Sequence, residues 1–308
     1  MLKKIWCVVT MLVVSMVMSI VICACGNTDA SQSIAASSNG TTKSGSLTCF
    51  SGNLQVTGST ALQPLAKNVA AAYQQQCSGA NITVGGGGSS TGLKNAQDGS
   101  SQIGNSDIFA NKSRYPDLVD HQVAAVAFSV IINENVTNVR NLTSQQLKRI
   151  YSGQATNWKE FGGPDLPIVA VSRPAGSGTR VTFEEYVLGQ REKITGNPIA
   201  NASGEVATTV NQTAGAISYI ASDYARKNNL NVVTLDNVDE TAANIENNSY
   251  KFWNIEHMYT KGAASGLAKA YIDYTKSPDT APLRRKQGFL DISKISQAAL
   301  KAKTPKNI

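Results

Sequence analysis

One recurring arrangement constrains the fold of this 308-residue chain more than any other feature. At three places a short apolar stretch ends, small hydroxyl and glycine residues follow, and apolar residues then recur at helical spacing. The three turns are Gly58-Ser59-Thr60-Ala61, Gly88-Ser89-Ser90-Thr91-Gly92 and Gly176-Ser177-Gly178-Thr179. Strands that alternate with helices through such turns are typical of an α/β domain, so the sequence predicts an α/β fold.

Apolar periodicity predicts the elements around these turns. Residues 53–57 and 123–132 have the β-branched and apolar character of strands, and apolar residues between positions 62 and 73 recur at helical spacing. A later helix is expected to begin after Thr143, a good N-cap residue, with Gln146 at the capping-box position. Further strands are expected at residues 82–84, 103–107, 167–172, 216–220 and 252–259, and further helices around residues 93–96, 183–187, 206–210 and 267–274.

The N-terminus carries an export pattern. Lys3 and Lys4 precede an uncharged, mainly apolar run that continues to Cys23, so residues 1–24 are expected to be a signal peptide. The residues just before Cys25 resemble the lipobox of bacterial lipoproteins, in which cleavage before a cysteine leaves a thiol that carries diacylglycerol. Lipidation of Cys25 would place the chain on the cell membrane, facing the exterior.

The alternative is an uncleaved anchor. Residues 5–25 approach the roughly 20 apolar residues that span a bilayer. Either interpretation leaves the body of the protein outside the membrane. Residues 25–46 are rich in Ser, Thr, Ala, Asn and Gly, and they have too little apolar surface to offset the entropy of ordering. We expect a disordered tether there, with the folded protein beginning near Leu47.

Two of the five cysteines remain in the predicted folded body. Cys7 and Cys23 leave with the signal peptide and Cys25 is lipidated, which leaves Cys49 and Cys77. An oxidising exterior permits a disulfide. Cys49 precedes a strand and Cys77 follows the helix that packs back on that strand, so we expect the pair to be bonded; the alternative is two free thiols.

Charge and motifs exclude several function classes. The formal net charge of the chain is +7. The basic residues are spread along the sequence and not gathered in runs, which argues against nucleic-acid binding. His121 and His257 are the two histidines, and neither sits in a catalytic or metal-ligand pattern. We therefore expect no metal, no cofactor and no enzymatic activity.

The three turns suit an anion. At a helix N-terminus several backbone N–H groups lack partners, and the helix macrodipole presents a partial positive charge there. Hydroxyl groups add donors, and glycine lets the backbone approach closely. Three such turns, together with the single cation of Arg173, are typical of a cage for a tetrahedral oxyanion.

The same residues resemble a known family, the PstS-type phosphate-binding proteins, which deliver phosphate to the permease and ATPase subunits of ABC importers. The likeness runs from about residue 54 to the last predicted strands. It is carried by Gly58-Ser59-Thr60, Gly88-Ser89-Ser90-Thr91-Gly92-Leu93-Lys94, Gly104-Asn105-Ser106-Asp107, Arg173-Pro174-Ala175-Gly176-Ser177-Gly178-Thr179 and Ala214-Gly215-Ala216-Ile217-Ser218-Tyr219.

The resemblance implies eight phosphate-binding residues, with Arg173 as the cation and Asp107 as an acceptor. Two positions depart from the family pattern. Ala61 stands where a bulkier aromatic residue is common, and Ala175 stands where an acidic residue often braces the arginine. The implied site consists of Thr60, Ala61, Ser89, Asp107, Arg173, Ser177, Gly178 and Thr179.

The carboxylate of Asp107 indicates which anion the predicted site prefers. A carboxylate that faces a bound dianion is repulsive unless the ligand brings a hydrogen to share. Phosphate holds a proton at neutral pH and sulfate does not, and a site of this kind can reject such an analogue by about 10⁴ or more. The simpler interpretation of Asp107, as a residue that caps a turn, is favoured by sequence alone but not by its place in the motif.

The implied architecture is a two-lobed type II periplasmic-binding-protein fold. One lobe would comprise residues 47–127 and 254–308, and the other residues 128–253, with two strands crossing between them as a hinge. Closure would trap phosphate, and the unit would be monomeric. Three alternatives stay open: another tetrahedral oxyanion such as sulfate or molybdate, a surface phosphoester hydrolase that uses Ser177, and an adhesin that has lost its ligand.

Overall fold

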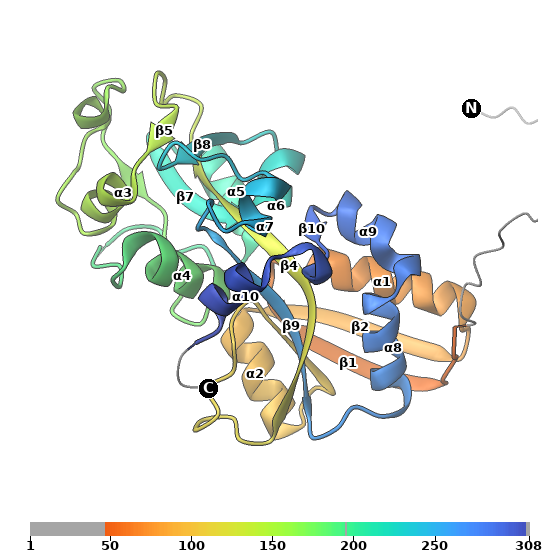
Figure 1. Cartoon of the computed structure of the whole chain (residues 1–308). Coiled ribbons are helices and arrows are strands. Elements are labelled where there is room, and N and C mark those ends of the chain that lie inside the picture. The colour runs from red at the N-terminus through yellow and green to blue at the C-terminus, as the bar shows by residue number, and fades with distance from the viewer. Residues whose placement is uncertain (1–46, 195, 306–308) are drawn as a thin grey trace, which may run out of the picture. The chain divides into compact units, whose positions relative to one another are not determined.

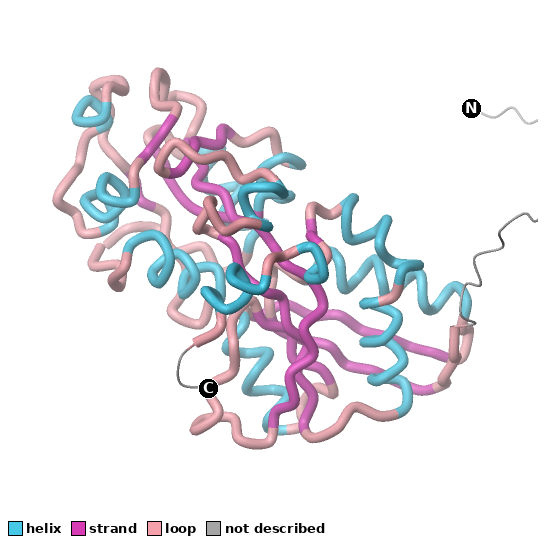
Figure 2. The backbone as a smooth tube through the Cα atoms, in the orientation of Figure 1, coloured by secondary structure: helices cyan, strands magenta, loops and turns pink. Residues whose placement is uncertain are grey.

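The computed structural model of the chain describes residues 47–194 and 196–305 (Figure 1). The predicted signal peptide, the tether and Cys25 lie outside the described residues. The described residues belong to one compact unit. No helix in that part of the chain combines the length and the apolar character that a bilayer crossing requires. Figure 2 shows helices packed around strands, as the predicted α/β class requires.

The first elements alternate as strand, helix, strand, helix and strand. The first three strands pair in parallel in the order β2-β1-β3. This confirms the elements predicted from the apolar periodicity of this region. Their bounds are β1 (Gly52–Gly58), α1 (Gln63–Gln76), β2 (Ala80–Gly87), α2 (Ser89–Asp98) and β3 (Ile103–Ser106).

Glycines let α2 lie directly on the sheet. A Cβ atom at Gly92 would lie 2.4 Å from the carbonyl oxygen of Asn105 and 2.9 Å from that of Thr57, so no larger residue fits there. Gly58 has a φ of +134°, which other residues rarely adopt. This close contact places the N-terminus of α2 beside the ends of β1 and β3.

A long strand, β4 (Leu118–Ile132), joins two groups of strands. Its first part pairs antiparallel with β9 (Trp253–Lys261) as far as Ala127, opposite Trp253. From Phe128 it pairs instead with β7 and β8. β9 also pairs antiparallel with β3. The described strands thereby form one ten-stranded sheet.

The segment between β4 and β9 adds the second group of strands and its helices. The capping box of α3 is present as predicted: the Thr143 side chain accepts from the Gln146 amide, and the Gln146 side chain accepts from the Thr143 amide. The elements here are β5 (Asn141–Leu142), α3 (Ser144–Tyr151), η1 (Trp158–Phe161), β6 (Val169–Ala170), α4 (Gly178–Phe183), η2 (Glu184–Leu188), α5 (Ser203–Gln212), β7 (Ala216–Ala221), α6 (Ser222–Lys227), β8 (Asn231–Leu235) and α7 (Ala242–Glu246).

The strand expected at residues 167–172 is shorter than predicted. Only Val169–Ala170 pairs with β7 as a strand. Beyond this pair, Ile168 donates to Thr156 and Ser172 donates to Pro198, while Val171 still donates to Ile217 of β7. The strand is therefore a short edge element that delivers Arg173 into the following turn.

The C-terminal segment, which follows β9, contacts both the first elements of the chain and the segment between β4 and β9. Tyr271 of α8 donates to the Ala66 carbonyl of α1 at 2.7 Å. By contrast, the last helix contacts the segment between β4 and β9, where Lys303 donates to the Lys251 carbonyl at 2.7 Å and Tyr186 donates to the Lys303 carbonyl at 3.1 Å. The bounds are α8 (Gly266–Lys276), η3 (Pro278–Thr280), α9 (Ala281–Lys286), β10 (Phe289–Leu290), η4 (Ile292–Lys294) and α10 (Gln297–Lys303).

A disulfide connects Cys49, just before β1, to Cys77, the residue that ends α1. Their Cα atoms lie 5.3 Å apart, within the range that a disulfide spans. The bond closes the β1-α1 unit and fixes the start of the described chain onto the helix.

Candidate functional site

The three predicted turns meet at one place, although they lie far apart in the sequence. The Ser90 amide at the start of α2 donates to the Gly176 carbonyl at 3.1 Å. Arg173 Nη2 donates to Thr60 Oγ1 at 3.3 Å. We call the following residues of these turns the polar cluster: Thr60, Ser89, Asp107, Arg173, Ser177, Gly178 and Thr179, all of them buried.

Thr60 binds a residue that the sequence did not predict. Besides Arg173, its hydroxyl lies 3.1 Å from Ser203 Oγ and accepts from the Ser203 amide at 3.3 Å. Ser203 is 1% exposed and begins α5. A further helix N-terminus therefore points at the cluster. The sequence signal for this helix start was Ser203 followed by Gly204 after an irregular segment. The apolar pattern indicated the helix only from residue 206.

Ser59 organises the first turn from within. Its hydroxyl oxygen accepts from the Ala61 amide at 3.1 Å and from the Leu62 amide at 3.0 Å. Ser59 thus caps the turn that leads into α1. The amide of Ala61, which the family resemblance assigns to phosphate, is directed at Ser59 in this conformation.

Asp107 directly follows β3 and is 2% exposed. Its amide donates to Ser89 Oγ at 3.0 Å, and its Oδ2 accepts from Thr179 Oγ1 at 3.1 Å. Oδ1 has no hydrogen-bond partner among the described residues. Burial raises the pKa of Asp107, while the hydroxyls of Ser59 and Thr179 and the charge of Arg173 oppose that rise. The group can therefore act as a buried acceptor.

Arg173 is held by backbone carbonyls where the family often uses an acidic residue. Its Nε donates to the Ala200 carbonyl at 2.8 Å, and Nη2 lies 3.4 Å from the Asn201 carbonyl oxygen. These carbonyls therefore orient the guanidinium even though Ala175 replaces the acidic residue that is common in the family. Burial lowers the pKa of Arg173, but an arginine side chain stays protonated in proteins. Nη1 has no partner in the described part of the chain.

The third turn forms the start of α4. Ser177 Oγ accepts from the Arg180 amide at 3.3 Å and so serves as the N-cap. Arg180 Nη1 in turn donates to the Arg173 carbonyl at 2.6 Å, which fixes the backbone that carries the guanidinium. Gly178 and Thr179 are the first two residues of the helix, where backbone N–H groups lack intrahelical acceptors.

The two histidines lie outside the polar cluster. Neither histidine contacts Ser177: His121 Nε2 lies 3.0 Å from Thr260 Oγ1, and His257 Nδ1 lies 2.7 Å from Asp120 Oδ1. The described residues contain no group of three His, Cys, Asp or Glu side chains placed to hold a metal ion. One buried cation, one buried carboxyl and several hydroxyl and amide donors remain, a set that suits an oxyanion carrying a proton.

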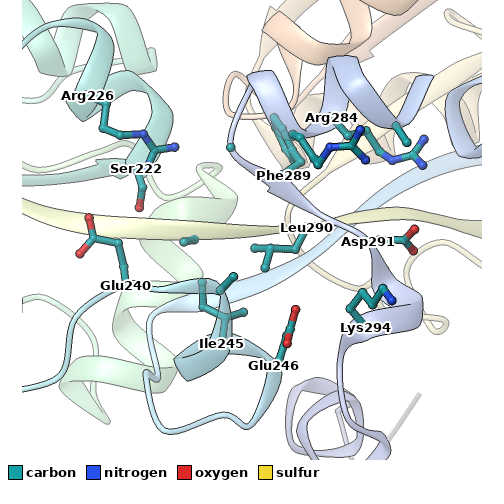
Figure 3. Close-up of a pocket in the computed structure, with 15 residues that line it drawn as sticks. Ser222, Arg226, Glu240, Ile245, Glu246, Arg284, Phe289, Leu290, Asp291 and Lys294 are labelled. Carbon is teal, nitrogen blue, oxygen red and sulfur yellow. The ribbon is translucent and has the colours of Figure 1, made fainter. Parts of the chain in front are cut away.

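A separate cavity of about 420 Å³ lies elsewhere in the fold (Figure 3). Its lining comes from α6, α7, α9, β10 and the loops beside them, and it includes Ala127, where β4 passes from β9 to β7. No residue of the polar cluster lines it. Charged residues of both signs line it, among them Arg226, Glu240, Arg284 and Asp291.

Comparisons with known proteins agree on one family. A family model described as the PBP superfamily domain matches residues 34–279. The phosphate-binding protein PstS of Bacillus subtilis is 38% identical over 275 residues, which cover 88% of this chain and 89% of that protein.

Solved structures give the same picture. A candidate phosphate ABC transporter substrate-binding protein from Clostridium perfringens, with bound phosphate, is 33% identical, with a TM-score of 0.74, and covers 78% of this chain and 100% of its own. An ABC-type phosphate transport receptor from Vibrio cholerae is 26% identical, with a TM-score of 0.63, and covers 77% of this chain and 99% of its own.

Proposed function

Because the chain belongs to the PBP superfamily and, within it, to the family of PstS phosphate-binding proteins, we propose that it captures inorganic phosphate outside the cell and delivers it to an ABC importer. One observation carries the proposal. Arg173 Nη1 and Asp107 Oδ1 are buried in one cluster, and neither has a partner among the described residues. A buried donor and a buried acceptor of this kind are costly unless a ligand pairs with them.

The two groups divide the recognition between them. The guanidinium of Arg173 neutralises negative charge, with help from the backbone N–H groups at the starts of α2, α4 and α5. Asp107 accepts the hydrogen that phosphate carries. Sulfate brings no hydrogen, so it would face an ionised carboxylate without a shared proton. The same geometry therefore binds anions and rejects one class of them.

Lobe closure is the second part of the proposal. We assign residues 47–127 and 254–308 to one lobe and residues 128–253 to the other, with β4 and β9 crossing between them. The change of pairing partner along β4 between Ala127 and Phe128 supports this boundary. Bonds such as Thr179 to Asp107 would then join the lobes and form only on closure. The docking of α10 on Tyr186 adds a further link.

The remaining assignments complete the transport role. A lipid on Cys25 would hold the protein at the outer face of the cell membrane as a monomeric binding unit. The closed, loaded form would be the one that docks on the permease, whose ATPase subunits drive import. The disulfide between Cys49 and Cys77 supports an oxidising exterior.

The proposal is tested by titrating the purified, extensively dialysed protein with phosphate, sulfate and molybdate. Calorimetry gives the affinities, and the emission of the buried Trp158 and Trp253 reports a change of conformation. We expect tight phosphate binding and sulfate binding weaker by about 10⁴. Equal affinities for sulfate and phosphate, or no binding of any of the three anions, would overturn the proposal. Turnover of a chromogenic phosphate ester that Ser177→Ala abolishes would replace it with a hydrolase.

A further inference from the structure

A second carboxyl group lies beside the proposed phosphate site. Glu256, on β9, is 0% exposed. Neither of its oxygens has a hydrogen-bond partner among residues 47–194 and 196–305. A fully buried carboxyl without a cation or a donor is unstable in its charged form. This side chain was not part of the sequence-based site and needs a physical explanation.

Strand register places Glu256 against Asp107. β3 and β9 are antiparallel, and Ser106 pairs with His257. One further step in the same register puts Asp107 opposite Glu256. Directly opposite residues in an antiparallel pair have Cβ atoms about 4.5–5.5 Å apart, so their side chains interact. In agreement with this, each of the two carboxyl groups affects the pKa of the other.

Two adjacent buried carboxyl groups do not both ionise, so one of them holds a proton. Burial raises the pKa of Glu256 well above its ordinary value, and Asp107 raises it further. Burial also raises the pKa of Asp107, but Ser59, Thr179 and Arg173 stabilise its charged form. The proton of the pair therefore resides on Glu256, which makes Glu256 a donor toward Asp107.

Other ionisable groups do not change this assignment. On the other flank of β9, the residue opposite Glu256 is Ala124 of β4. Asp120 of the same strand bonds to His257 Nδ1 at 2.7 Å. From the turn before α4, Arg173 supplies the cation, and it acts on Asp107. In the described chain no cation is among the groups that shift the pKa of Glu256.

We propose that Glu256 is a positioning residue whose protonated carboxyl donates a hydrogen bond to Asp107, keeps Asp107 ionised as an acceptor, and thereby sets the preference for a protonated oxyanion. This inference rests on the proposed phosphate function. Glu256 acts on the ligand through Asp107, because an ionised carboxylate has about four lone-pair sites and can accept from Glu256 and from the ligand at once. Without its donor, Asp107 would take up a proton more readily, become a donor itself, and tolerate sulfate.

Two substitutions separate this role from simple packing. Glu256→Gln keeps the size and a donor but cannot titrate, whereas Glu256→Leu fills similar space without a donor. Phosphate and sulfate affinities are measured by calorimetry from pH 5.5 to 8 for both variants, for the wild type and for the half-buried control Glu246→Gln.

We expect the ratio of phosphate to sulfate affinity in Glu256→Gln and in the control to stay within about threefold of wild type. In Glu256→Leu the ratio should fall at least tenfold at the acid end of the range. The inference is overturned if Glu256→Leu keeps the wild-type ratio at every pH, or if Glu256→Gln loses as much as Glu256→Leu. The protonation of phosphate itself is common to all the proteins and cancels in the comparison.

A spectroscopic measurement decides the matter even if Glu256→Leu does not fold. The infrared spectrum of the wild type at neutral pH should contain a protonated carboxylic acid band that is absent from Glu256→Gln. Identical spectra in this region would sink the inference. The measurement needs no ligand, so it separates the two proposals: a wild type that fails to bind phosphate refutes the function, whereas a missing band refutes only the role of Glu256.

Discussion

Gly178, the first residue of α4, lies so close to Ser89 of α2 that a Cβ atom added at Gly178 would be 2.3 Å from the Ser89 hydroxyl oxygen. The same atom would lie 2.9 Å from Cβ of Asp107. These neighbours come from residues 47–127, which we assign to the opposite lobe. The φ of Gly178 is not in the left-handed region, so space alone requires glycine at this position.

Gly178→Ala should therefore prevent full closure. We expect phosphate affinity to fall at least tenfold while the thermal stability of the protein without ligand changes little, because an open form has room for the methyl group. Gly204→Ala is the matched control, since a Cβ atom there meets nothing within 4 Å. Calorimetry and thermal unfolding measure the two effects. Unchanged affinity in Gly178→Ala would mean that this contact is not made in the bound state.

Asp107→Asn should keep phosphate binding but reduce discrimination. The carboxamide still accepts a hydrogen bond from phosphate and carries no charge to repel sulfate. We expect phosphate affinity within a few-fold of wild type and a selectivity over sulfate lowered at least tenfold, with the exposed Asp117→Asn as control. In the wild type, sulfate affinity should rise as the pH falls through the raised pKa of Asp107, and this dependence should vanish in Asp107→Asn. Selectivity that survives the substitution would assign discrimination to another residue.

Much of the fold, and the three turns that lie together in it, could be predicted from local sequence signals. The turns at Gly58, Gly88 and Gly176 each combine strand, glycine, hydroxyl and helix, and that combination was readable without any tertiary information. The features of the cluster that were not predicted depend on contacts between distant segments. Ser203 enters the cluster only because α5 points at Thr60, and no periodic pattern in the sequence announces that contact. The brace of Arg173 by the Ala200 carbonyl is a backbone contact, which side-chain identity does not encode.

Glu256 was hidden for a related reason. A glutamate within an apolar strand pattern looks like an exposed residue, and only the pairing register of β3 with β9 places it opposite Asp107. Register between strands about 150 residues apart is set by the whole sheet. Sequence reasoning therefore finds the residues that line one turn more readily than those that act across strands.

Arg173→Ala should weaken phosphate and sulfate alike. The substitution removes the one cation of the cluster and leaves the Ala200 carbonyl without its donor. A hydrogen bond to a charged group contributes about 1.5–3 kcal/mol, so we expect losses of roughly 10- to 150-fold for each anion. Arg191→Ala is an exposed control. A loss confined to one anion would contradict the role assigned to the guanidinium.

Removal of the disulfide should cost stability without changing the ligand preference. Cys49 and Cys77 are separated by 28 positions, and the chain-entropy model gives about 3–4 kcal/mol for a loop of that length. The double variant Cys49→Ser/Cys77→Ser should show that loss in urea unfolding, and its selectivity for phosphate over sulfate should stay unchanged. The wild type treated with a reductant serves as the comparison. An equal free energy of unfolding with and without the bond would mean that the unfolded state gains little freedom.

Lys303, on α10, should make the stability of the protein depend on pH. The side chain is 1% exposed, and burial lowers its pKa to about 6. With this pKa, the unfolded chain would hold a proton that the native protein has released between about pH 6 and the ordinary lysine pKa of 10.5, so we expect the free energy of unfolding to rise with pH in that range. The slope for one proton is at most about 1.4 kcal/mol per pH unit. The ring faces of Tyr186 and Trp253, whose centroids lie 3.4 Å and 5.0 Å from Nζ, favour the ammonium form and reduce this slope.

Lys303→Met should remove that contribution, because a methionine of similar length fills the site without a titrating group. Urea unfolding at intervals from pH 6 to 9 should give a flatter dependence on pH than in the wild type, with the largest gain in stability at the acid end. Lys301→Met, an exposed position on the same helix, should keep the wild-type slope. A slope in Lys303→Met equal to that of the wild type would mean that the native protein keeps the proton on Lys303, and that the aromatic faces outweigh burial at this position.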